Sequence, residues 1–133
     1  MKNSIPLVGL WHLALKVQDI TQSRYFYQNI LGMEVVWEPD PENLYLSLGK
    51  DNLALHQIPQ GAPSLRLENH PLDHFGFIVS DKEGVDIAAE KMSSAGIDVV
   101  KPARLHRDGS YSFYVKDPDG NLIQILYDPH IGF

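Results

Sequence analysis

The chain has 133 residues, enough for one domain with a hydrophobic core, and its 44% hydrophobic and 21% charged residues are typical of a globular protein. The absence of cysteine excludes disulfides, thiolate ligands and cysteine nucleophiles, and it permits a reducing compartment. A net charge of −6 without a lysine- or arginine-rich run disfavours nucleic acid and anionic membranes as partners. No apolar stretch approaches the roughly 20 residues of a membrane span, and residues 1–10 lack the pattern of a signal peptide. We therefore expect a cytoplasmic protein that acts on a small molecule.

The first half of the chain predicts a strand, a helix and three further strands. Alternating apolar residues predict a strand over residues 10–17. Asp19 is a typical helix N-cap with Gln22 as its capping-box partner, and Gly32 is a typical residue just after a helix. Further strands, separated by proline- and glycine-containing turns, are predicted at about 33–38, 43–48 and 52–58.

The second half repeats this plan after a linker at residues 59–71, which is rich in proline and glycine. A strand at 72–79 leads to Ser80, which is predicted to cap a helix that ends at Gly96. The remaining strands are predicted at about 97–100, 111–117 and 121–127.

The two halves also resemble each other in sequence. His12-Leu-Ala-Leu-Lys-Val-Gln-Asp19 matches His74-Phe-Gly-Phe-Ile-Val-Ser-Asp81, and the segment that ends at His56 matches the segment that ends at Gln124. We therefore predict an α+β protein made of two tandem βαβββ modules, which form a curved mixed sheet around a metal and substrate cavity. Module one covers about residues 8–58 and module two about 72–127, within a single domain over 1–133.

Four polar side chains fall on the strand faces opposite the bulky apolar residues. They are His12, His56, His74 and Gln124. Three of them have a small residue two positions away, Ala14, Ala54 or Gly76, which leaves open volume beside them. One such histidine alone is more typical of a satisfied side chain. Four at equivalent positions of a repeat predict a divalent-metal site, because neutral imidazoles and a glutamine carbonyl suit such a cation.

The other polar candidates carry a weaker signal. His70, His106 and His130 are each predicted to lie on the solvated surface. Possible substrate-binding residues are Trp37, Tyr111 and Arg104, although packing or a solvated position explains each of them equally well.

These motifs, with Tyr25-Phe-Tyr27 and Asp117-Pro-Asp-Gly-Asn-Leu-Ile-Gln124, resemble the vicinal oxygen chelate superfamily over about residues 9–127. That group includes glyoxalase I, bleomycin-resistance proteins, fosfomycin-modifying transferases and extradiol dioxygenases. The resemblance implies that one divalent ion, Ni, Zn, Mn, Co or Fe, is bound by the first and last strands of each module, at His12, His56, His74 and Gln124. It also implies a homodimer whose sites are shared between chains.

The chain departs from the pattern of the glyoxalase-like members. These usually have glutamate at the position of Gln124 and often at that of His56, and one such carboxylate moves the substrate proton. A neutral ligand shell leaves the charge of the metal uncompensated, which favours an anionic ligand such as an enediolate, carboxylate or phosphonate. His56 is then the candidate general base, because an imidazole titrates near neutral pH.

The first hypothesis for function is a metal-dependent lyase or isomerase of the glyoxalase type, in which the metal binds two neighbouring oxygens of a small substrate. An extradiol-type dioxygenase comes second. Fosfomycin-type transfer comes third, because no residue set in the sequence is specific for that substrate. A non-catalytic binding protein of the bleomycin-resistance type is the alternative outside enzymology, and a regulatory paralogue is a third class.

Overall fold

The computed structural model describes residues 5–65 and 68–131, which belong to two compact units, Met1–Ala62 and Pro63–Phe133. The boundary between the units lies inside the predicted linker, of which residues 66 and 67 lie outside the described residues. Each unit contains one four-stranded mixed sheet and one helical segment. The predicted α+β class and the two tandem modules are confirmed, whereas their union in a single domain stays a prediction.

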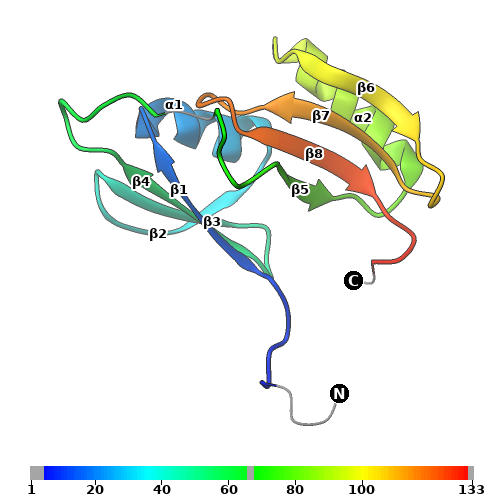
Figure 1. Cartoon of the computed structure of the whole chain (residues 1–133), viewed down its shortest axis with the longest axis horizontal. Coiled ribbons are helices and arrows are strands. Elements are labelled where there is room, and N and C mark those ends of the chain that lie inside the picture. The colour runs from blue at the N-terminus through cyan, green and yellow to red at the C-terminus, as the bar shows by residue number, and fades with distance from the viewer. Residues whose placement is uncertain (1–4, 66–67, 132–133) are drawn as a thin grey trace. The chain divides into compact units, whose positions relative to one another are not determined.

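The elements of the first unit are β1 (His12–Val17), α1 (Ile20–Arg24), the π-helix η1 (Tyr25–Ile30), β2 (Glu34–Asp40), β3 (Asn43–Ser47) and β4 (Asn52–Gln57). The strands lie in the order β1-β4-β3-β2 (Figure 1). β1 and β4 are parallel, and the other neighbours are antiparallel. The two strands that carry His12 and His56 are therefore direct neighbours.

The helical segment of this unit begins as predicted and then widens. Oδ1 of Asp19 accepts hydrogen bonds from the backbone N–H groups of Thr21 at 3.0 Å and Gln22 at 3.4 Å, which caps α1. From Tyr25 onward the α-helix gives way to the π-helix η1, a wider turn than the sequence pattern predicts. Gly32, at a φ of 81°, ends the segment in the left-handed conformation expected there.

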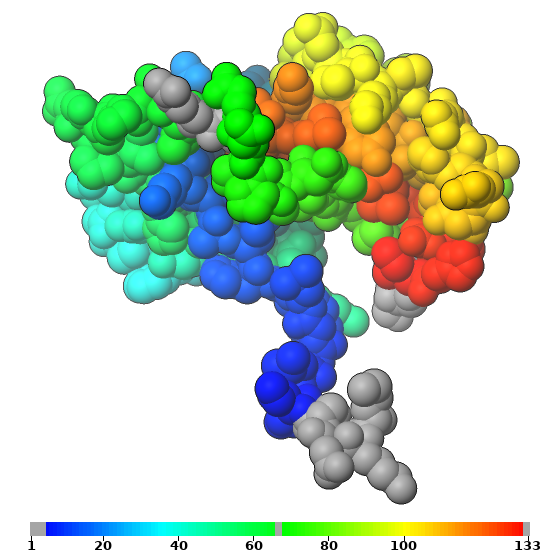
Figure 2. Space-filling view, viewed as in Figure 1, coloured from blue at the N-terminus to red at the C-terminus, as the bar shows by residue number. Residues whose placement is uncertain are grey.

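The core of the first unit lies on the face of the sheet opposite His12. Leu15 and Val17 of β1 are buried, as the alternation of β1 predicts, together with apolar residues of β3 and β4. Trp11, an apolar residue inside the predicted strand 10–17, is 50% exposed. It precedes β1, where the chain extends away from the rest of this unit (Figure 2).

The elements of the second unit are β5 (Phe75–Ile78), α2 (Lys82–Ser94), β6 (Val99–Leu105), β7 (Tyr111–Lys116) and β8 (Leu122–Tyr127). The strands lie in the order β5-β8-β7-β6, with β5 and β8 parallel. α2 packs on one face of this sheet, against β8, β7 and β6. The side chains between them are buried, among them Val85, Phe113, Val115 and Ile123. Each stabilises the fold by about 1.5–3 kcal/mol through the loss of apolar surface to water.

Several boundaries in the second unit differ from the prediction. β5 begins at Phe75 rather than at residue 72, so His74 directly precedes the strand. Asp81 rather than Ser80 caps α2, and its Oδ1 accepts from the N–H of Gly84 at 2.8 Å. β6 continues to Leu105 instead of ending near residue 100. It tolerates Pro102 because it is an edge strand, where a missing N–H costs no ladder bond. Within the part of the chain that the structure describes, no helix is long and apolar enough to cross a membrane.

Candidate metal centre

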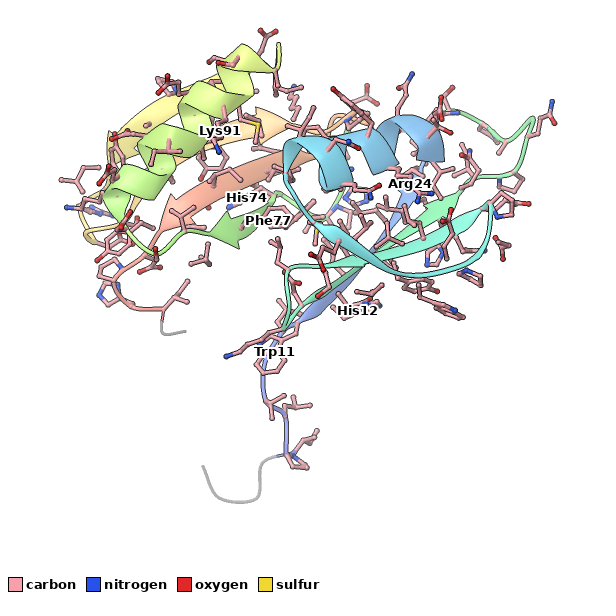
Figure 3. All side chains as sticks on the ribbon, turned by 180° about the vertical axis from the view of Figure 1, so that it is seen from behind. Trp11, His12, Arg24, His74, Phe77 and Lys91 are labelled. Carbon is pink, nitrogen blue, oxygen red and sulfur yellow. The ribbon has the colours of Figure 1, made fainter. Side chains whose placement is uncertain are left out.

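His74 and Gln124 meet on the sheet face of the second unit that α2 leaves uncovered. Gln124 lies on β8 directly opposite Gly76 of β5. His74, which Figure 3 labels, lies two residues before Gly76. Nε2 of His74 is 3.1 Å from Oε1 of Gln124. Gly76 lets β5 and β8 pair closely beside this contact, since a Cβ there would lie 3.0 Å from the backbone carbonyl oxygen of Gln124.

The neighbouring hydrogen bonds determine which atoms of the pair carry hydrogen. Nδ1 of His74 lies 2.6 Å from Oδ1 of Asp73, and a carboxylate only accepts, so Nδ1 carries the hydrogen. Nε2 of Gln124 donates to Oγ of Ser112 at 2.9 Å, which turns Oε1 toward His74. In a neutral imidazole, the lone pair of Nε2 therefore faces a second acceptor. A second proton on the ring, a turned amide that presents its NH₂ group, or a metal ion between the two atoms would each satisfy this contact.

The geometry of the pair fits a metal ion. Two neighbouring ligand atoms bound at about 2.0–2.1 Å in a tetrahedral or octahedral shell lie about 2.8–3.4 Å from each other. The separation of 3.1 Å between Nε2 of His74 and Oε1 of Gln124 falls in this range. Asp73 bonded to the far nitrogen of His74 also follows the carboxylate–histidine arrangement that orients metal ligands. Donor types, spacing and outer partners of these two residues thus suit a divalent cation.

Ser112 extends this cluster to His106. Ser112 is 1% exposed, and its Oγ lies 3.1 Å from Nε2 of His106. Because the hydroxyl oxygen accepts from Gln124, its hydrogen is available to His106. The prediction that His106 belongs to the solvated surface is therefore wrong: it is partly buried and bonded. Nearby, hydrogen bonds from the side chain and backbone of Ser110 lower the pKa of Asp108.

Sequence reasoning missed the partners of the predicted ligands, although a signal for two of them was present. Ser112 lies on the same face as Gln124 because the neighbouring Phe113 faces the core, so the alternation of β7 could have placed it. Asp73 directly precedes His74 in the chain. The position of His106 follows from the hairpin between β6 and β7, which has no comparable signal.

In the first unit, His12 has a similar local arrangement. His12, which Figure 3 labels, is the first residue of β1. It lies opposite Asn52 of β4. Its Nδ1 is 2.9 Å from Oδ1 of Asn52, which only accepts, so Nδ1 carries the hydrogen and Nε2 presents a lone pair. The imidazole is exposed, and Nε2 is suited to bind a metal ion.

The register of β1 and β4 separates His56 from His12. His56 lies opposite Lys16, four positions further along than His12, which is roughly 13 Å at about 3.3 Å per residue. Side chains stand roughly perpendicular to a sheet, whereas two ligands of one ion lie within about 4 Å of each other. The prediction that His56 binds the same ion as His12, and acts there as a base, is therefore wrong. Nδ1 of His56 instead lies 2.6 Å from Oδ1 of Asn43.

The register also corrects the alignment of the two repeats. His12 corresponds to His74, and two residues later Ala14 corresponds to Gly76. Gln124 lies opposite Gly76, and Ala54 lies opposite Ala14. The counterpart of Gln124 is therefore Ala54 and not His56, so only the second unit carries a histidine with an amide neighbour.

The three predicted substrate-binding residues lie in different environments. Tyr111 donates a hydrogen bond to Asp86 of α2 at 2.6 Å, on the opposite face of the sheet from Gln124, so its predicted role is wrong. This bond raises the pKa of the Tyr111 phenol because it stabilises the protonated form. Arg104 lies opposite Ser112 and is exposed. Trp37 is 58% exposed on β2.

Within the described part of each unit, the acidic and histidine side chains do not form a complete set of metal ligands. Across residues 5–65 and 68–131, no three side chains of His, Cys, Asp or Glu gather around one point. The first unit also has a surface hollow of about 500 Å³, which lies away from His12. It is lined by Gln18, Glu42, Gln57, Ile58, Pro59, Gln60, Gly61 and Ala62.

Comparison with known proteins places these features in context. The model of the family described as Glyoxalase/Bleomycin resistance protein/Dioxygenase superfamily matches residues 9–125. The chain is 28% identical to the protein PA2024 of Pseudomonas aeruginosa over 92% of this chain and 91% of that protein. It is also 28% identical to 2,2',3-trihydroxybiphenyl dioxygenase of Sphingomonas paucimobilis over 96% of this chain, but spans only 47% of that enzyme. Among solved structures, lactoylglutathione lyase from Agrobacterium tumefaciens superposes with a TM-score of 0.77 at 27% identity, over 97% of this chain and 100% of that one.

Proposed function

Because the chain belongs to the glyoxalase/bleomycin resistance protein/dioxygenase superfamily, we propose that it is a divalent-metal-dependent enzyme of the lyase or isomerase type. Its substrate is a small oxygen-rich molecule bound through two neighbouring oxygens. The similarity to lactoylglutathione lyase over nearly the whole chain supports this reaction class over others in the superfamily.

The observation that carries the proposal is the contact between His74 and Gln124. Nε2 of His74 and Oε1 of Gln124 lie 3.1 Å apart, and each side chain is held in place by a hydrogen bond on its far side. We assign His74 and Gln124 as metal ligands. His12 is a further proposed ligand, because its Nε2 presents the same kind of donor and the family pattern includes it. The bound cation would act as a Lewis acid toward the substrate oxygens.

The chain's own contribution is to orient these ligands and to favour an anionic substrate. Asp73, Asn52 and Ser112 hold the rings and the amide in the required orientation. All proposed ligands are neutral, so the positive charge of the ion stays available to a negatively charged substrate oxygen. Lys101, whose Nζ lies 5.0 Å from the centre of the Tyr114 ring beside His74, adds a second positive charge on this face.

Metal binding tests the proposal directly. Protein purified without a histidine tag and stripped with chelator should take up about one Zn²⁺ or Ni²⁺ per chain in a calorimetric titration. His74→Ala and Gln124→Ala should each lower the affinity by at least about tenfold. His130→Ala is the matched control, since this histidine is exposed and bonds Asp128. An unchanged metal affinity in His74→Ala would refute the assignment of His74 as a ligand. The metal-loaded wild-type protein should also convert an α-ketoaldehyde–thiol adduct.

The similarity to an extradiol-type enzyme supports a second candidate, a dioxygenase, although that relative is about twice as long as this chain. Protein that binds Fe²⁺ or Mn²⁺ and consumes oxygen with a catechol would favour this reaction. Protein that binds a small organic ligand equally well without metal would favour a binding protein of the bleomycin-resistance type.

We also propose a homodimer, as the family resemblance implies, in the cytoplasm, which the absence of cysteine permits. Light scattering should then give about 30 kDa, twice the chain mass of 15.0 kDa. A mass of one chain at micromolar concentration would refute the dimer.

A further inference from the structure

A chain of hydrogen bonds joins the proposed ligand pair of the second unit to His106. Nε2 of His74 lies 3.1 Å from Oε1 of Gln124, and Nε2 of Gln124 lies 2.9 Å from Oγ of Ser112. Oγ of Ser112 lies in turn 3.1 Å from Nε2 of His106, which belongs to the hairpin between β6 and β7. His106 is partly buried, and Ser112 stands between it and the ligand pair.

The hydroxyl of Ser112 couples the directions of these hydrogen bonds. It has one hydrogen to donate, and its oxygen accepts on the other side. Ser112 is 1% exposed, so water does not readily replace either partner. The hydrogen therefore goes either to His106 or to Gln124, and the side chain that does not receive it becomes the donor. The order of donors and acceptors along the chain thus has two forms.

In the first form, Ser112 donates to His106. The hydroxyl oxygen then accepts from the NH₂ group of Gln124, which leaves Oε1 of Gln124 toward His74, as in the structure. Nδ1 of His74 carries the ring hydrogen because it faces the carboxylate of Asp73, so Nε2 of a neutral His74 offers a lone pair as well. This form presents two acceptors to a cation, and it requires that His106 carry its hydrogen on Nδ1.

In the second form, His106 carries its hydrogen on Nε2 and donates to Ser112. The hydroxyl then donates to Oε1 of Gln124, whose amide is turned over and gives its NH₂ group to Nε2 of His74. The oxygen and nitrogen of an amide exchange places with little change of shape, so the three separations of 2.9–3.1 Å suit this form as well. Each of these donors faces an acceptor without a cation. The second form therefore fits the metal-free protein.

We propose that metal binding reverses this chain of hydrogen bonds and is coupled in this way to the tautomer of His106. The metal-free protein holds the second form, and the metal-bound protein holds the first. During the change, the ring of His106 releases the hydrogen on Nε2 to water and takes one from water on Nδ1. The inference rests on the proposed function, because it requires that His74 and Gln124 bind the ion. His106 is then a positioning residue, which acts on the metal through Ser112 and Gln124.

Nitrogen NMR of the imidazole rings observes the tautomer directly. At a pH of about 8, above the ordinary histidine pKa of about 6.5, the rings are neutral, and a nitrogen that carries hydrogen gives a ¹⁵N signal far from that of a nitrogen with a lone pair. The chain has six histidines, and His106→Gln identifies the signals of this ring. His106 should carry its hydrogen on Nε2 in chelator-stripped protein and on Nδ1 at saturating Zn²⁺. In Ser112→Ala, saturating Zn²⁺ should leave this tautomer unchanged.

Two neutral substitutions test the influence of His106 on affinity, since coupling between two sites is reciprocal. In His106→Phe, the hydrogen of the buried hydroxyl keeps only Gln124 as an acceptor, which favours the second form. Calorimetry should show Zn²⁺ binding weaker by about fivefold or more, because the metal-bound form leaves a buried donor unpaired. His106→Gln offers an amide oxygen in place of Nε2 and should stay within about threefold of wild type. His130→Phe is the matched control and should leave affinity unchanged, because His130 is exposed and bonds Asp128.

The substitution Gln124→Glu separates positioning from an effect on the fold. A carboxylate only accepts hydrogen bonds, so Ser112 donates to it with or without a metal ion. In this background, His106→Phe should change zinc affinity by less than about twofold, although it removes the same side chain. A loss of equal size in both backgrounds would overturn the inference, because it would show that His106 acts on the fold alone.

Metal binding and tautomer together distinguish this inference from the proposed metal centre. Zinc binding that depends on His74 but leaves the tautomer of His106 unchanged overturns the inference and leaves the metal centre in place. With ¹¹³Cd²⁺ instead of zinc, coupling to a ring nitrogen of His74 is expected, and coupling to His106 would make it a ligand and overturn the inference as well. Wild-type protein that takes up no metal refutes the metal centre and the inference with it.

Discussion

Replacing Ser112 with alanine removes the hydroxyl that connects Gln124 to His106. Its oxygen lies 2.9 Å from Nε2 of Gln124 and 3.1 Å from Nε2 of His106, and Ser112 is 1% exposed. A hydrogen bond contributes about 0.5–1.5 kcal/mol net, and water can replace part of it because both partners are only partly buried. We therefore expect Ser112→Ala to lower the free energy of unfolding by about 1–2 kcal/mol.

The same substitution should weaken metal binding by about tenfold or more. Without Ser112, the amide of Gln124 can turn and present its NH₂ group to His74, and an amide nitrogen is a poor metal ligand. This effect is separate from the loss of stability, because it depends on which atom of Gln124 faces His74.

Urea unfolding and calorimetric Zn²⁺ titration measure the two effects. Ser47→Ala is the matched control, since Ser47 is a largely buried serine that donates to the carbonyl of Asp51 at 2.7 Å in the first unit. It should lower stability without changing zinc affinity. If Ser112→Ala loses stability but binds zinc as tightly as wild type, the orienting role of the hydroxyl is refuted and only a structural role remains.

Three further predictions follow from single contacts. Gln124→Glu should raise zinc affinity at least about tenfold, because a carboxylate oxygen offsets part of the ion's charge; an unchanged affinity in titration would show that this side chain does not bind the ion. The hydrogen bond to Asp86 raises the pKa of Tyr111. The bond should therefore stabilise the fold fully at pH values below the ordinary tyrosine pKa of about 10, and this stabilisation should be lost as the pH rises through the higher pKa of the folded protein. Absorbance titration should show one tyrosine ionising late, and Tyr111→Phe should lack it. Gly76→Ala should lower the melting temperature, because its Cβ would lie 3.0 Å from the carbonyl oxygen of Gln124 and 3.1 Å from Cδ2 of Leu126; a melting temperature equal to that of wild type would show that the strands move apart freely.

Much of the local structure could be predicted from the sequence because short-range signals determine it. The cap at Asp19 and the left-handed glycine at Gly32 depend on residues close in the chain. The buried faces of β1 and β8 follow from strict alternation, as the burial of Val17 and Ile123 shows. The predicted strand boundaries were wrong where pairing with a neighbouring strand determines them. β6 is an example, because it pairs with β7 well past its predicted end.

The candidate site shows this difference most clearly. The sequence alone placed His12, His56, His74 and Gln124 on the faces opposite the buried residues, because strand alternation has a period of two. It could not determine the pairing register, because a slip of two residues returns every side chain to the same face and leaves the apolar pattern intact. Only the paired strands show that Ala54, and not His56, is the counterpart of Gln124.

The partners of the proposed ligands also depend on tertiary structure. Ser112 approaches Gln124 because β7 pairs with β8, and His106 reaches Ser112 because a hairpin returns the chain from β6. A hydrogen bond between side chains requires positions correct to a few tenths of an ångström. The sequence therefore determined which residue types face the site, and the backbone pairing of the folded chain decided which of their atoms meet.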